Sequence, residues 1–450
     1  MAATLTPPAS SAPATPAASA LPELLRKLRS REARVGVIGL GYVGLPLAVE
    51  FARAGFRVTG FEVDAEKVAS IERGDSYIAD VPAEELREQR AKERLSATTD
   101  WSRLAEMDTI SICVPTPLRK TKDPDLSFIL RASERVQATL RRGQLVVLES
   151  TTYPGTTEEV VLPMLLEGGL KAGQDFFLAF SPERVDPGNP DFQTRNIPKI
   201  VGGVTADCGR AAEALYHASV DRVMVVSNAQ TAEMAKLLEN TFRNVNIGLV
   251  NELALLCREL KVNVWEVIEA ASTKPFGFMP FHPGPGLGGH CIPVDPVYLS
   301  WKARVEGFEP RLIEVAQQIN SRMPEHVVAR IAAALNDAGK PLRRARVHVL
   351  GIAYKRDVND MRESPALDVM HHLLRQQAEV RYTDPYVPHL REMGLEFDSQ
   401  PLESLREADC AVIVTDHSCF DYRQIVRQAR LVVDTRNALR GIRSAKIYGL

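Results

Sequence analysis

Short apolar segments alternate with amphipathic stretches from residue 34 onward, and this alternation is the strongest structural pattern in the chain. Runs rich in Val, Ile, Leu and Phe that are bounded by turn residues predict buried strands, whereas the stretches between them have helical spacing. Repeated β–α alternation predicts a doubly wound parallel sheet of the Rossmann type, to which we assign residues 31–220. The expected strands cover residues 35–39, 57–62, 109–114, 145–150, 176–180, 200–203 and 222–226.

A different pattern occupies the middle of the chain. Between residues 231 and 260, apolar side chains recur at three- and four-residue steps with few helix breakers, which predicts one long helix. A segment rich in Gly and Pro, residues 274–296, then interrupts the helical region. We therefore predict a central long-helix domain over residues 221–325.

The β–α rhythm returns after Pro341, with expected strands at residues 346–351, 379–383, 411–415 and 431–434. This predicts a second, smaller Rossmann-like α/β domain over residues 326–450, with a ligand cleft between the two α/β domains. The other end of the chain lacks such a rhythm. Because its first twenty residues are mostly Ala, Pro, Ser and Thr, we predict a disordered tail over residues 1–30.

Composition narrows the class of protein. The 55 Lys and Arg residues nearly balance the 57 Asp and Glu residues, so the formal charge of -2 favours neither nucleic acid nor an anionic membrane as a partner. No run approaches the roughly 18 to 20 apolar residues of a membrane span, and no secretory signal is evident. The six cysteines lack C-x-x-C or metal-ligand spacing. We expect a cytoplasmic protein with free thiols and no metal.

A glycine-rich loop directly follows the first expected strand and opens a helix. Its pattern is Gly39-x-Gly41-Tyr42-Val43-Gly44, in which the glycines permit a tight turn and close approach of a pyrophosphate to the helix N-terminus. Glu62 ends the second strand, where an acid accepts hydrogen bonds from an adenosine ribose and favours NAD over NADP. The alternative is a plain glycine turn beside a surface glutamate.

Polar turns follow the next strands of the predicted sheet. Pro115 and Thr116 come after the third strand, Thr151 after the fourth, and Glu183 with Arg184 after the fifth. In open α/β sheets, ligands bind outside the carboxyl ends of the strands. These residues are therefore candidates for contact with cofactor or water, and Glu183 is the best carboxylate for base work. A solvated loop is the alternative for each of them.

The breaker-rich central segment contains the sequence Gly-Leu-Gly-Gly-His-Cys-Ile-Pro-Val-Asp, which ends at Asp295. It sets Cys291 in a glycine-rich bend with a carboxylate four residues on, and no apolar periodicity places this thiol in a core. Cys291 is therefore a candidate nucleophile, although a free cysteine is often structural. We expect the neighbouring His290 to have a flanking polar role rather than to act as the base.

Two polar side chains on the predicted long helix stand four residues apart. Lys236 and Asn240 point from one helix face toward a common neighbour, and an ammonium and an amide aimed together suit a developing oxyanion. A solvated lysine paired with Glu233 or Glu239 is the alternative. In the last domain, Lys355, Arg362 and Arg436 follow strands or begin a helix, where cations stabilise phosphate.

Taken in order, these motifs resemble the nucleotide-sugar 6-dehydrogenases of the UDP-glucose/GDP-mannose dehydrogenase family. The resemblance covers about residues 34–440. It rests on the dinucleotide loop, Val114-Pro115-Thr116-Pro117, Ser150-Thr151, Ser181-Pro182-Glu183, Lys236 with Asn240, Gly288-Gly289-His290-Cys291 with Asp295, Tyr354-Lys355 and Arg362-Glu363-Ser364.

The resemblance implies an NAD-dependent, four-electron oxidation of the C6 hydroxyl of a UDP-sugar to a carboxylate by a homodimer that joins through the long helix. Cys291 would form a thiohemiacetal and then a thioester. The implied catalytic residues are Cys291, Lys236, Asn240, Asp295, Glu183 and Thr151. The implied NAD contacts are Gly39, Gly41, Tyr42, Val43, Gly44, Glu62, Pro115, Thr116, Thr151 and Arg362. The implied substrate contacts are Glu183, Arg184, Lys236, Asn240, Gly288, Tyr354, Lys355 and Arg436.

The same resemblance favours the branch that acts on UDP-N-acetylhexosamines and supplies surface polysaccharides. Val294 stands where UDP-glucose enzymes usually have lysine, and the loop before Cys291 lacks their substrate-contacting arginine. UDP-N-acetylglucosamine is the favoured substrate, and UDP-glucose and UDP-N-acetylmannosamine are the alternatives. A hydroxyacid dehydrogenase would have no use for Cys291. A catalytically silent NAD- and UDP-binding module is the alternative from another class of protein.

Overall fold

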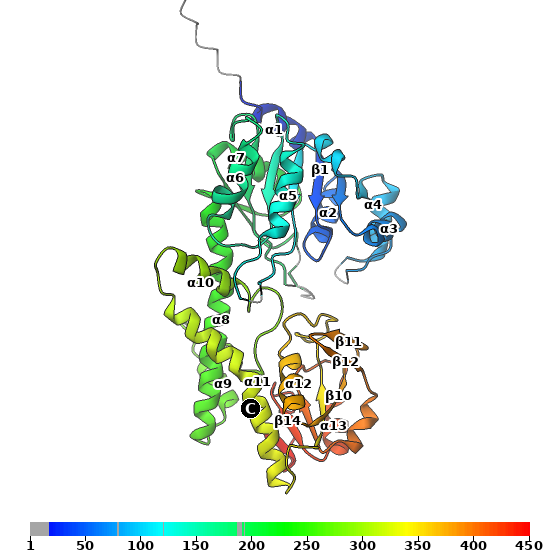
Figure 1. Ribbon diagram of the computed structural model, residues 1–450, viewed down its shortest axis with the longest axis vertical. Helices are drawn as coiled ribbons and strands as arrows, with labels where there is room; N and C mark the ends of the chain where they lie inside the picture. The colour runs from blue at the N-terminus through cyan, green and yellow to red at the C-terminus, as the bar shows by residue number, and fades with distance from the viewer. Residues whose placement is uncertain (1–17, 79–80, 120, 187–190, 193) are drawn as a thin grey trace, which may run out of the picture.

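The computed structural model describes residues 18–78, 81–119, 121–186, 191–192 and 194–450. Figure 1 shows two α/β units joined by a helical middle, in which the green helix α8 (Ala229–Glu259) runs beside the yellow helix α11 (Arg311–Asp337). The predicted fold class is therefore confirmed: a Rossmann-type domain, a long-helix region and a second α/β domain.

The first unit contains an eight-stranded sheet with the order β3-β2-β1-β4-β5-β6-β7-β8. All neighbouring strands are parallel except β6 and β7, which pair antiparallel. The seven expected strands are present, and β8 extends this sheet beyond the boundary that we placed at residue 220. The strands are β1 (Arg34–Ile38), β2 (Arg57–Phe61), β3 (Leu95–Thr98), β4 (Thr109–Ile112), β5 (Leu145–Leu148), β6 (Phe177–Phe180), β7 (Lys199–Gly203) and β8 (Val223–Val226).

Alternate side chains of the central strands enter two different cores, because successive residues of a strand face opposite sides of the sheet. In β5, Leu145 and Val147 join the core on one face, whereas Val146 and Leu148 join the core on the other. β3 was not predicted from the sequence because its segment is short and only half buried. The unit's helices are α1 (Leu21–Ser30), α2 (Gly44–Arg53), α3 (Ala65–Arg73), α4 (Ala83–Ala91), α5 (Ser127–Gln137), α6 (Leu162–Leu166) and α7 (Ala206–Tyr216), with η1 (Trp101–Glu106) and η2 (Thr157–Val161).

Helix α1 corrects the prediction of a disordered tail over residues 1–30. Residues 21–30 form a helix whose Leu21, Leu24 and Leu28 are buried in the core of the first unit. These leucines recur at three- and four-residue steps, which is the spacing of an amphipathic helix. Burial of this apolar face holds the segment in place. Residues 1–17 lie outside the described part of the chain.

The middle consists of α8, α9 (Val264–Ser272), α10 (Asp295–Val305) and the first half of α11. The predicted long helix over residues 231–260 is confirmed as α8. Helices α8 and α11 pack closely, since a side-chain carbon on Gly248 would lie 3.0 Å from the Ala316 Cβ. The boundary that we placed at residue 325 falls inside α11. The second half of this helix packs into the C-terminal core through Val327, Val328 and Ile331.

The C-terminal unit has a five-stranded parallel sheet with the order β10-β9-β13-β14-β15 and a hairpin of β11 and β12. The four expected strands are present, whereas the short β15 and the hairpin were not predicted. The elements are β9 (Arg346–Leu350), α12 (Pro365–Arg375), β10 (Glu379–Thr383), β11 (His389–Glu392), β12 (Leu395–Asp398), η3 (Leu402–Glu407), β13 (Cys410–Ile413), α13 (Tyr422–Gln428), β14 (Val432–Asp434) and β15 (Ile447–Gly449).

Candidate active site

The dinucleotide loop joins β1 to α2, and the structure explains the glycine at each of its three positions differently. Gly39 has a φ of 85°, and a side-chain carbon there would lie 2.6 Å from the Cys113 carbonyl oxygen. On Gly44 it would lie 1.8 Å from the carbonyl oxygen of Gly39, but on Gly41 it would meet nothing within 4 Å. The fold therefore requires two of the glycines, and Gly41 leaves open space for a pyrophosphate at the N-terminus of α2.

Glu62 lies beside this loop at the end of β2. One carboxylate oxygen accepts the backbone N–H of Leu40 at 3.0 Å, and the other accepts that of Val63 at 2.8 Å. These bonds orient the acid toward the loop, where it is placed to accept a ribose hydroxyl. From α10, the Tyr298 hydroxyl donates to the Thr116 carbonyl at 3.1 Å and holds the Pro115-Thr116 turn near the central segment.

Cys291 lies in the turn that immediately precedes α10. Its carbonyl oxygen accepts the backbone N–H of Asp295 at 2.8 Å, so nucleophile and carboxylate belong to one turn. From α8, Asn240 Nδ2 donates to Asp295 Oδ2 at 2.5 Å, and the charge of Lys236 acts on both Asp295 and Cys291. All three partners of the thiol are more than nine-tenths buried. The structure therefore brings together the four predicted residues Cys291, Asp295, Lys236 and Asn240.

Burial raises the pKa of both Asp295 and Cys291 in this cluster. Burial raises the pKa of Asp295 to about 6, although Lys236 and the Asn240 bond favour its ionised form. Burial also raises the pKa of the Cys291 thiol to about 11, opposed by Lys236. Asp295 is thus an ionised carboxylate with enough basicity to take a proton near neutral pH, whereas the thiol is protonated in this state.

Glu183 lies at the carboxyl end of β6, and its electrostatics differ from those of Asp295. Burial opposes its ionisation, but Lys199 and the N–H groups of Val185 and Arg184 together hold its pKa below the ordinary value. Those N–H groups lie 2.7–2.8 Å from Glu183 Oε1. Sequence analysis took Glu183 as the best base, but a carboxylate so stabilised is a poor one. The directions of the two pKa shifts make Asp295 the stronger candidate for base work and Glu183 a candidate for a fixed acceptor.

Two other predicted contacts of the first unit have different surroundings. Arg184 makes a two-pronged ion pair with Glu239 of α8, at 2.6 and 3.2 Å, and donates to the Pro198 carbonyl. Its guanidinium therefore ties its loop to α8 instead of projecting freely into the site. Thr151 is partly exposed at the carboxyl end of β5. The preceding Ser150 fixes this turn by donating to the Val114 carbonyl at 2.8 Å.

The C-terminal unit meets the Cys291 segment through glycines. A side-chain carbon on Gly288 would lie 2.7 Å from the Tyr354 Cβ, so the glycine permits close contact between these two protein segments. The N–H of Gly289 donates to the Arg362 carbonyl at 3.0 Å. The Arg362 guanidinium, held by Asp360, also lies 4.4 Å from the centre of the Tyr42 ring in the dinucleotide loop. Arg362 thereby connects three parts of the site.

The two remaining predicted cations lie at the same junction. Lys355 Nζ pairs with Asp186 of the first unit at 2.8 Å. Arg436, after β14, donates to the Val414 carbonyl, and its guanidinium lies close to Gly284, seven residues before Cys291. Burial lowers the pKa of Arg436 to about 10, which leaves it charged at neutral pH. Both cations are placed to meet phosphate between the two α/β units.

Comparison with known proteins decides the family. Residues 33–220 match the NAD binding domain, residues 230–322 the central domain and residues 348–441 the UDP binding domain of the UDP-glucose/GDP-mannose dehydrogenase family. The chain belongs to this family. NAD is therefore the cofactor, and the open Gly41 and the loop-facing Glu62 fit it.

Two relatives of this UDP-glucose/GDP-mannose dehydrogenase family member are named for different sugars. A UDP-N-acetyl-D-mannosamine dehydrogenase of Pyrococcus horikoshii is 40% identical, over 90% of this chain and 96% of its own. A UDP-N-acetyl-D-glucosamine 6-dehydrogenase of Salmonella typhi is 36% identical, over 86% and 91%. A solved structure of the Pyrococcus horikoshii UDP-D-ManNAc dehydrogenase has a TM-score of 0.85 at 37% identity, covering 92% of this chain and 98% of that one.

Sequence analysis named Glu233 only as a possible solvated partner of Lys236 and missed Asn244 and Asn251, and all three hold this family member's site together. Glu233 of α8 accepts the N–H groups of Gly155 and Thr157 after β5, and burial raises its pKa to about 7. Asn244 donates to the Ile292 carbonyl at 3.1 Å, and Asn251 accepts the N–H of Gly284 at 2.9 Å. The signal was present, since these residues share the face of α8 that carries Lys236 and Asn240.

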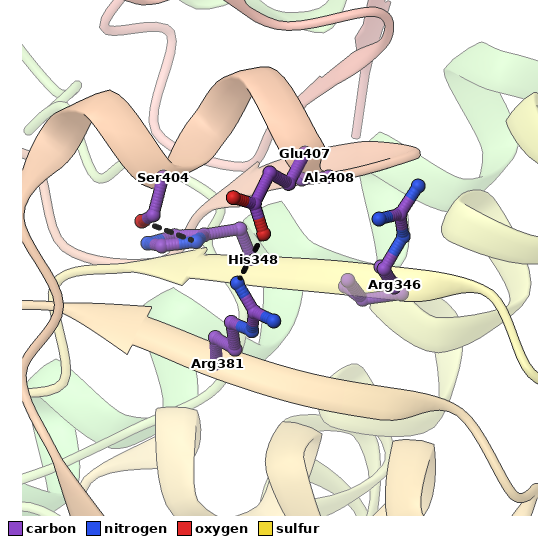
Figure 2. Close-up of a pocket in the computed structure, with 7 residues that line it drawn as sticks. Arg346, His348, Arg381, Ser404, Glu407 and Ala408 are labelled. Carbon is purple, nitrogen blue, oxygen red and sulfur yellow. Dashed lines mark hydrogen bonds and ion pairs between the residues drawn. The ribbon is translucent and has the colours of Figure 1, made fainter.

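A small hollow in the C-terminal unit of the dehydrogenase is separate from this site. Figure 2 shows His348 of β9 facing Ser404, with the Arg381–Glu407 ion pair beside them. The hollow measures about 10 Å³, which is room for one water molecule. Burial lowers the pKa of His348 to about 4, so the ring is neutral. None of the predicted site residues lines this hollow.

Among the helices in the described part of the chain, none has the length and apolar character that a membrane span requires.

Proposed function

We propose that this enzyme oxidises the C6 hydroxyl of a UDP-N-acetylhexosamine to a carboxylate for the synthesis of surface polysaccharide. The observation that carries the proposal is the meeting of Cys291 with Lys236, Asn240 and Asp295, at the junction of an NAD-binding and a UDP-binding domain. A two-electron alcohol oxidation needs no nucleophile. A cysteine beside a base and two oxyanion donors suits an oxidation that continues to the acid.

The proposed sequence of steps uses each of these groups. NAD would be held at the dinucleotide loop and would supply the oxidising power as the hydride acceptor, with two NAD used in succession for the two oxidation steps. Asp295 takes the proton of the C6 hydroxyl, which gives the aldehyde. The Cys291 sulfur then bonds to the aldehyde carbon and its proton passes to the oxygen, forming a thiohemiacetal. Lys236 and Asn240 stabilise negative charge on this oxygen.

Loss of the second hydride and the hydroxyl proton converts the thiohemiacetal into a thioester. Water then attacks the thioester carbon, the carbon–sulfur bond breaks, and Cys291 recovers its proton. Asp295, having released its first proton to solvent, takes a proton from this water, while Thr151 and the fixed acceptor Glu183 order it. The sum is one alcohol, two NAD and one water converted to one carboxylate, two NADH and three protons.

The identity of the sugar is the finer part of the proposal. The motifs around Cys291 favour an acetamido sugar, and both relatives described above act on such sugars according to their names. We take UDP-N-acetylglucosamine as the first candidate. UDP-N-acetylmannosamine is the second, because the relative with 40% identity is named for it.

We also propose that two copies pair through α8 and that the enzyme works in the cytoplasm. The apolar residues that predicted this helix are largely exposed: Leu238, Leu249 and Leu256 are 60%, 52% and 51% accessible. Such a stripe on a long helix favours an apolar partner, and a second copy brings the same stripe. The free cysteines are consistent with a reducing compartment.

One experiment tests the reaction. NADH formed per mole of limiting UDP-N-acetylglucosamine is measured beside UDP-N-acetylmannosamine and UDP-glucose, and the charge of each product is checked by ion exchange. We expect about two NADH and an acidic product from an acetamido sugar. Cys291→Ser should form no acid and allow at most the first hydride step. One NADH per sugar, or acid formation by Cys291→Ser at the normal rate, would contradict the mechanism.

A further inference from the structure

A buried ion-pair cluster lies directly behind Glu183 and has no part in the mechanism above. Lys199 Nζ lies 2.6 Å from Glu149 Oε2 and 3.4 Å from Glu183 Oε2. The other Glu149 oxygen accepts the Tyr216 hydroxyl. The side chains of Lys199 and Glu149 are 5% and 0% exposed, so the ammonium is enclosed between two carboxylates.

The topology of the sheet explains how a lysine reaches this position. β7 pairs antiparallel with β6, with Phe180 opposite Gly202. Lys199 is the first residue of β7, and an antiparallel strand begins where its neighbour ends. Lys199 therefore lies at the carboxyl edge of the sheet, beside the Glu183 turn. A parallel strand would have placed its first residue at the opposite edge.

The two carboxyls that flank Lys199 have opposite pKa shifts. Burial opposes ionisation of both carboxyls, yet the pKa of Glu149 is raised whereas that of Glu183 is lowered. Lys199 attracts both, but Glu183 also has two backbone N–H groups and the charge of Lys236. The titratable or charged groups that act on Lys199 and Glu183 are Glu149, Tyr216, Cys113, Lys236 and Cys291.

The hydrogen bonds that the Glu183 carboxylate already accepts limit how many further donors it can bind. Its carboxylate accepts the N–H groups of Arg184 and Val185 on Oε1 and the Lys199 ammonium on Oε2. An ionised carboxylate has about four lone-pair sites, so three donors leave about one for a water or a substrate hydroxyl. Without Lys199, the carboxylate would lose its nearest counter-charge and the donor to Oε2, and only the two backbone N–H groups on Oε1 would hold it.

Stability alone is a weak reason for such a cluster, because buried ion pairs often stabilise a fold no more than apolar residues of similar size. We propose that Lys199 is a positioning residue for the reaction, which fixes the orientation of the Glu183 carboxylate and supplies its counter-charge, with Glu149 and Tyr216 holding the ammonium in place. This inference rests on the proposed function, in which Glu183 orders water.

The test compares Lys199→Met, which keeps the aliphatic stem and removes the charge, with Lys199→Arg, which keeps the charge. Lys27→Met is the matched control, because Lys27 pairs with Asp108 at 2.9 Å beside the amino ends of the same sheet. The readouts are kcat and KM for the sugar and for NAD from pH 5.5 to 9. Binding of NAD, followed by the thermal shift that it produces, shows that each variant is folded.

We expect Lys199→Met to lower kcat at least tenfold at pH 6 with KM for NAD unchanged. The loss should be smaller at pH 9, where a Glu183 carboxyl without its counter-charge still ionises. Lys199→Arg should restore the wild-type pH profile, and Lys27→Met should leave it unchanged. A Lys199→Met profile that superimposes on the wild type would overturn the inference, as would a loss of equal size at every pH.

A double variant separates this inference from the proposed function. If Lys199 acts through Glu183, adding Lys199→Met to Glu183→Gln changes kcat less than twofold, whereas the two changes multiply if they are independent. Should Lys199→Met prevent folding, the same comparison is made with Lys199→Gln, which removes the charge but keeps a polar side chain. Full activity of Glu183→Gln would contradict the proposed role of Glu183. An impaired Glu183→Gln enzyme with a normal Lys199→Met enzyme would sink only the inference about Lys199.

Discussion

Replacement of Asp295 by asparagine should make the protein more stable and inactive. The carboxyl is 1% exposed, and burial raises its pKa from 3.8 to about 6. The folded protein therefore holds this proton more tightly than the unfolded chain, and stability is lost as pH rises from about 3.8 to 6. The rise of about two pKa units corresponds to about 3 kcal/mol at neutral pH, at 1.36 kcal/mol per unit.

Asparagine is nearly isosteric with the acid and keeps an oxygen that can accept the Asn240 bond. We expect Asp295→Asn to gain up to about 3 kcal/mol at pH 7.5 but only about 1 kcal/mol at pH 4.5, where the wild-type carboxyl is already protonated. Loss of the base should lower kcat at least about 100-fold. Buried charge at a functional site is thus retained at the expense of stability.

Thermal denaturation at the two pH values measures the effect as a difference in Tm between Asp295→Asn and the wild type. Asp221→Asn is the control, because Asp221 is an exposed carboxylate in the same chain that pairs with Arg195. We expect a rise of a few degrees at pH 7.5 for Asp295→Asn and no change of that size for the control. The reasoning is refuted if Asp295→Asn is no more stable than the wild type at pH 7.5, or if its gain is equal at both pH values.

Three further predictions concern the pH profile, the thiol and the dimer. In the wild type, kcat/KM should fall about tenfold per pH unit below about pH 6 as Asp295 gains a proton, and a limb near pH 4 would contradict this. Because the pKa of Cys291 is raised to about 11, its alkylation by iodoacetamide, followed by mass spectrometry, should accelerate about tenfold per pH unit from pH 7 to 9. Lys236→Met should slow this alkylation by removing a favourable charge, and an equal rate would argue against their coupling. Leu249→Glu should shift the protein from the proposed dimer to monomer in light scattering, whereas Met393→Glu, at a more exposed apolar residue of the C-terminal unit, should leave the dimer intact.

The sequence alone determined most of the helices and strands and the edge of the sheet at which the site forms. Strands such as β5 are uninterrupted apolar runs. This composition is typical of strands that are buried on both faces of a parallel sheet. Parallel strands end at one edge, so the polar turns after them meet there whatever the details of packing. The glycine pattern of the dinucleotide loop and the motif around Cys291 could be recognised because their chemistry depends on neighbours within a few residues.

Other features were decided by tertiary structure, because a pattern of side chains defines a face but does not say what covers it. The leucines of α8 form the stripe that predicted a helix, yet many of them are exposed, and its buried face carries Lys236, Asn240 and Asn244. Conversely, the leucines of α1 lie in the core although their segment follows a tail-like composition.

The roles of the two acids also required the fold. Sequence analysis gave both Glu183 and Asp295 as implied catalytic carboxyls, and their surroundings separate them: Lys199 and two backbone N–H groups lower the pKa of Glu183, while burial raises that of Asp295. Lys199 itself reaches the site through the reversed direction of β7, which strand composition does not reveal. Side-chain type is fixed locally, but a pKa depends on burial and on charges from distant parts of the chain, which only folding brings together.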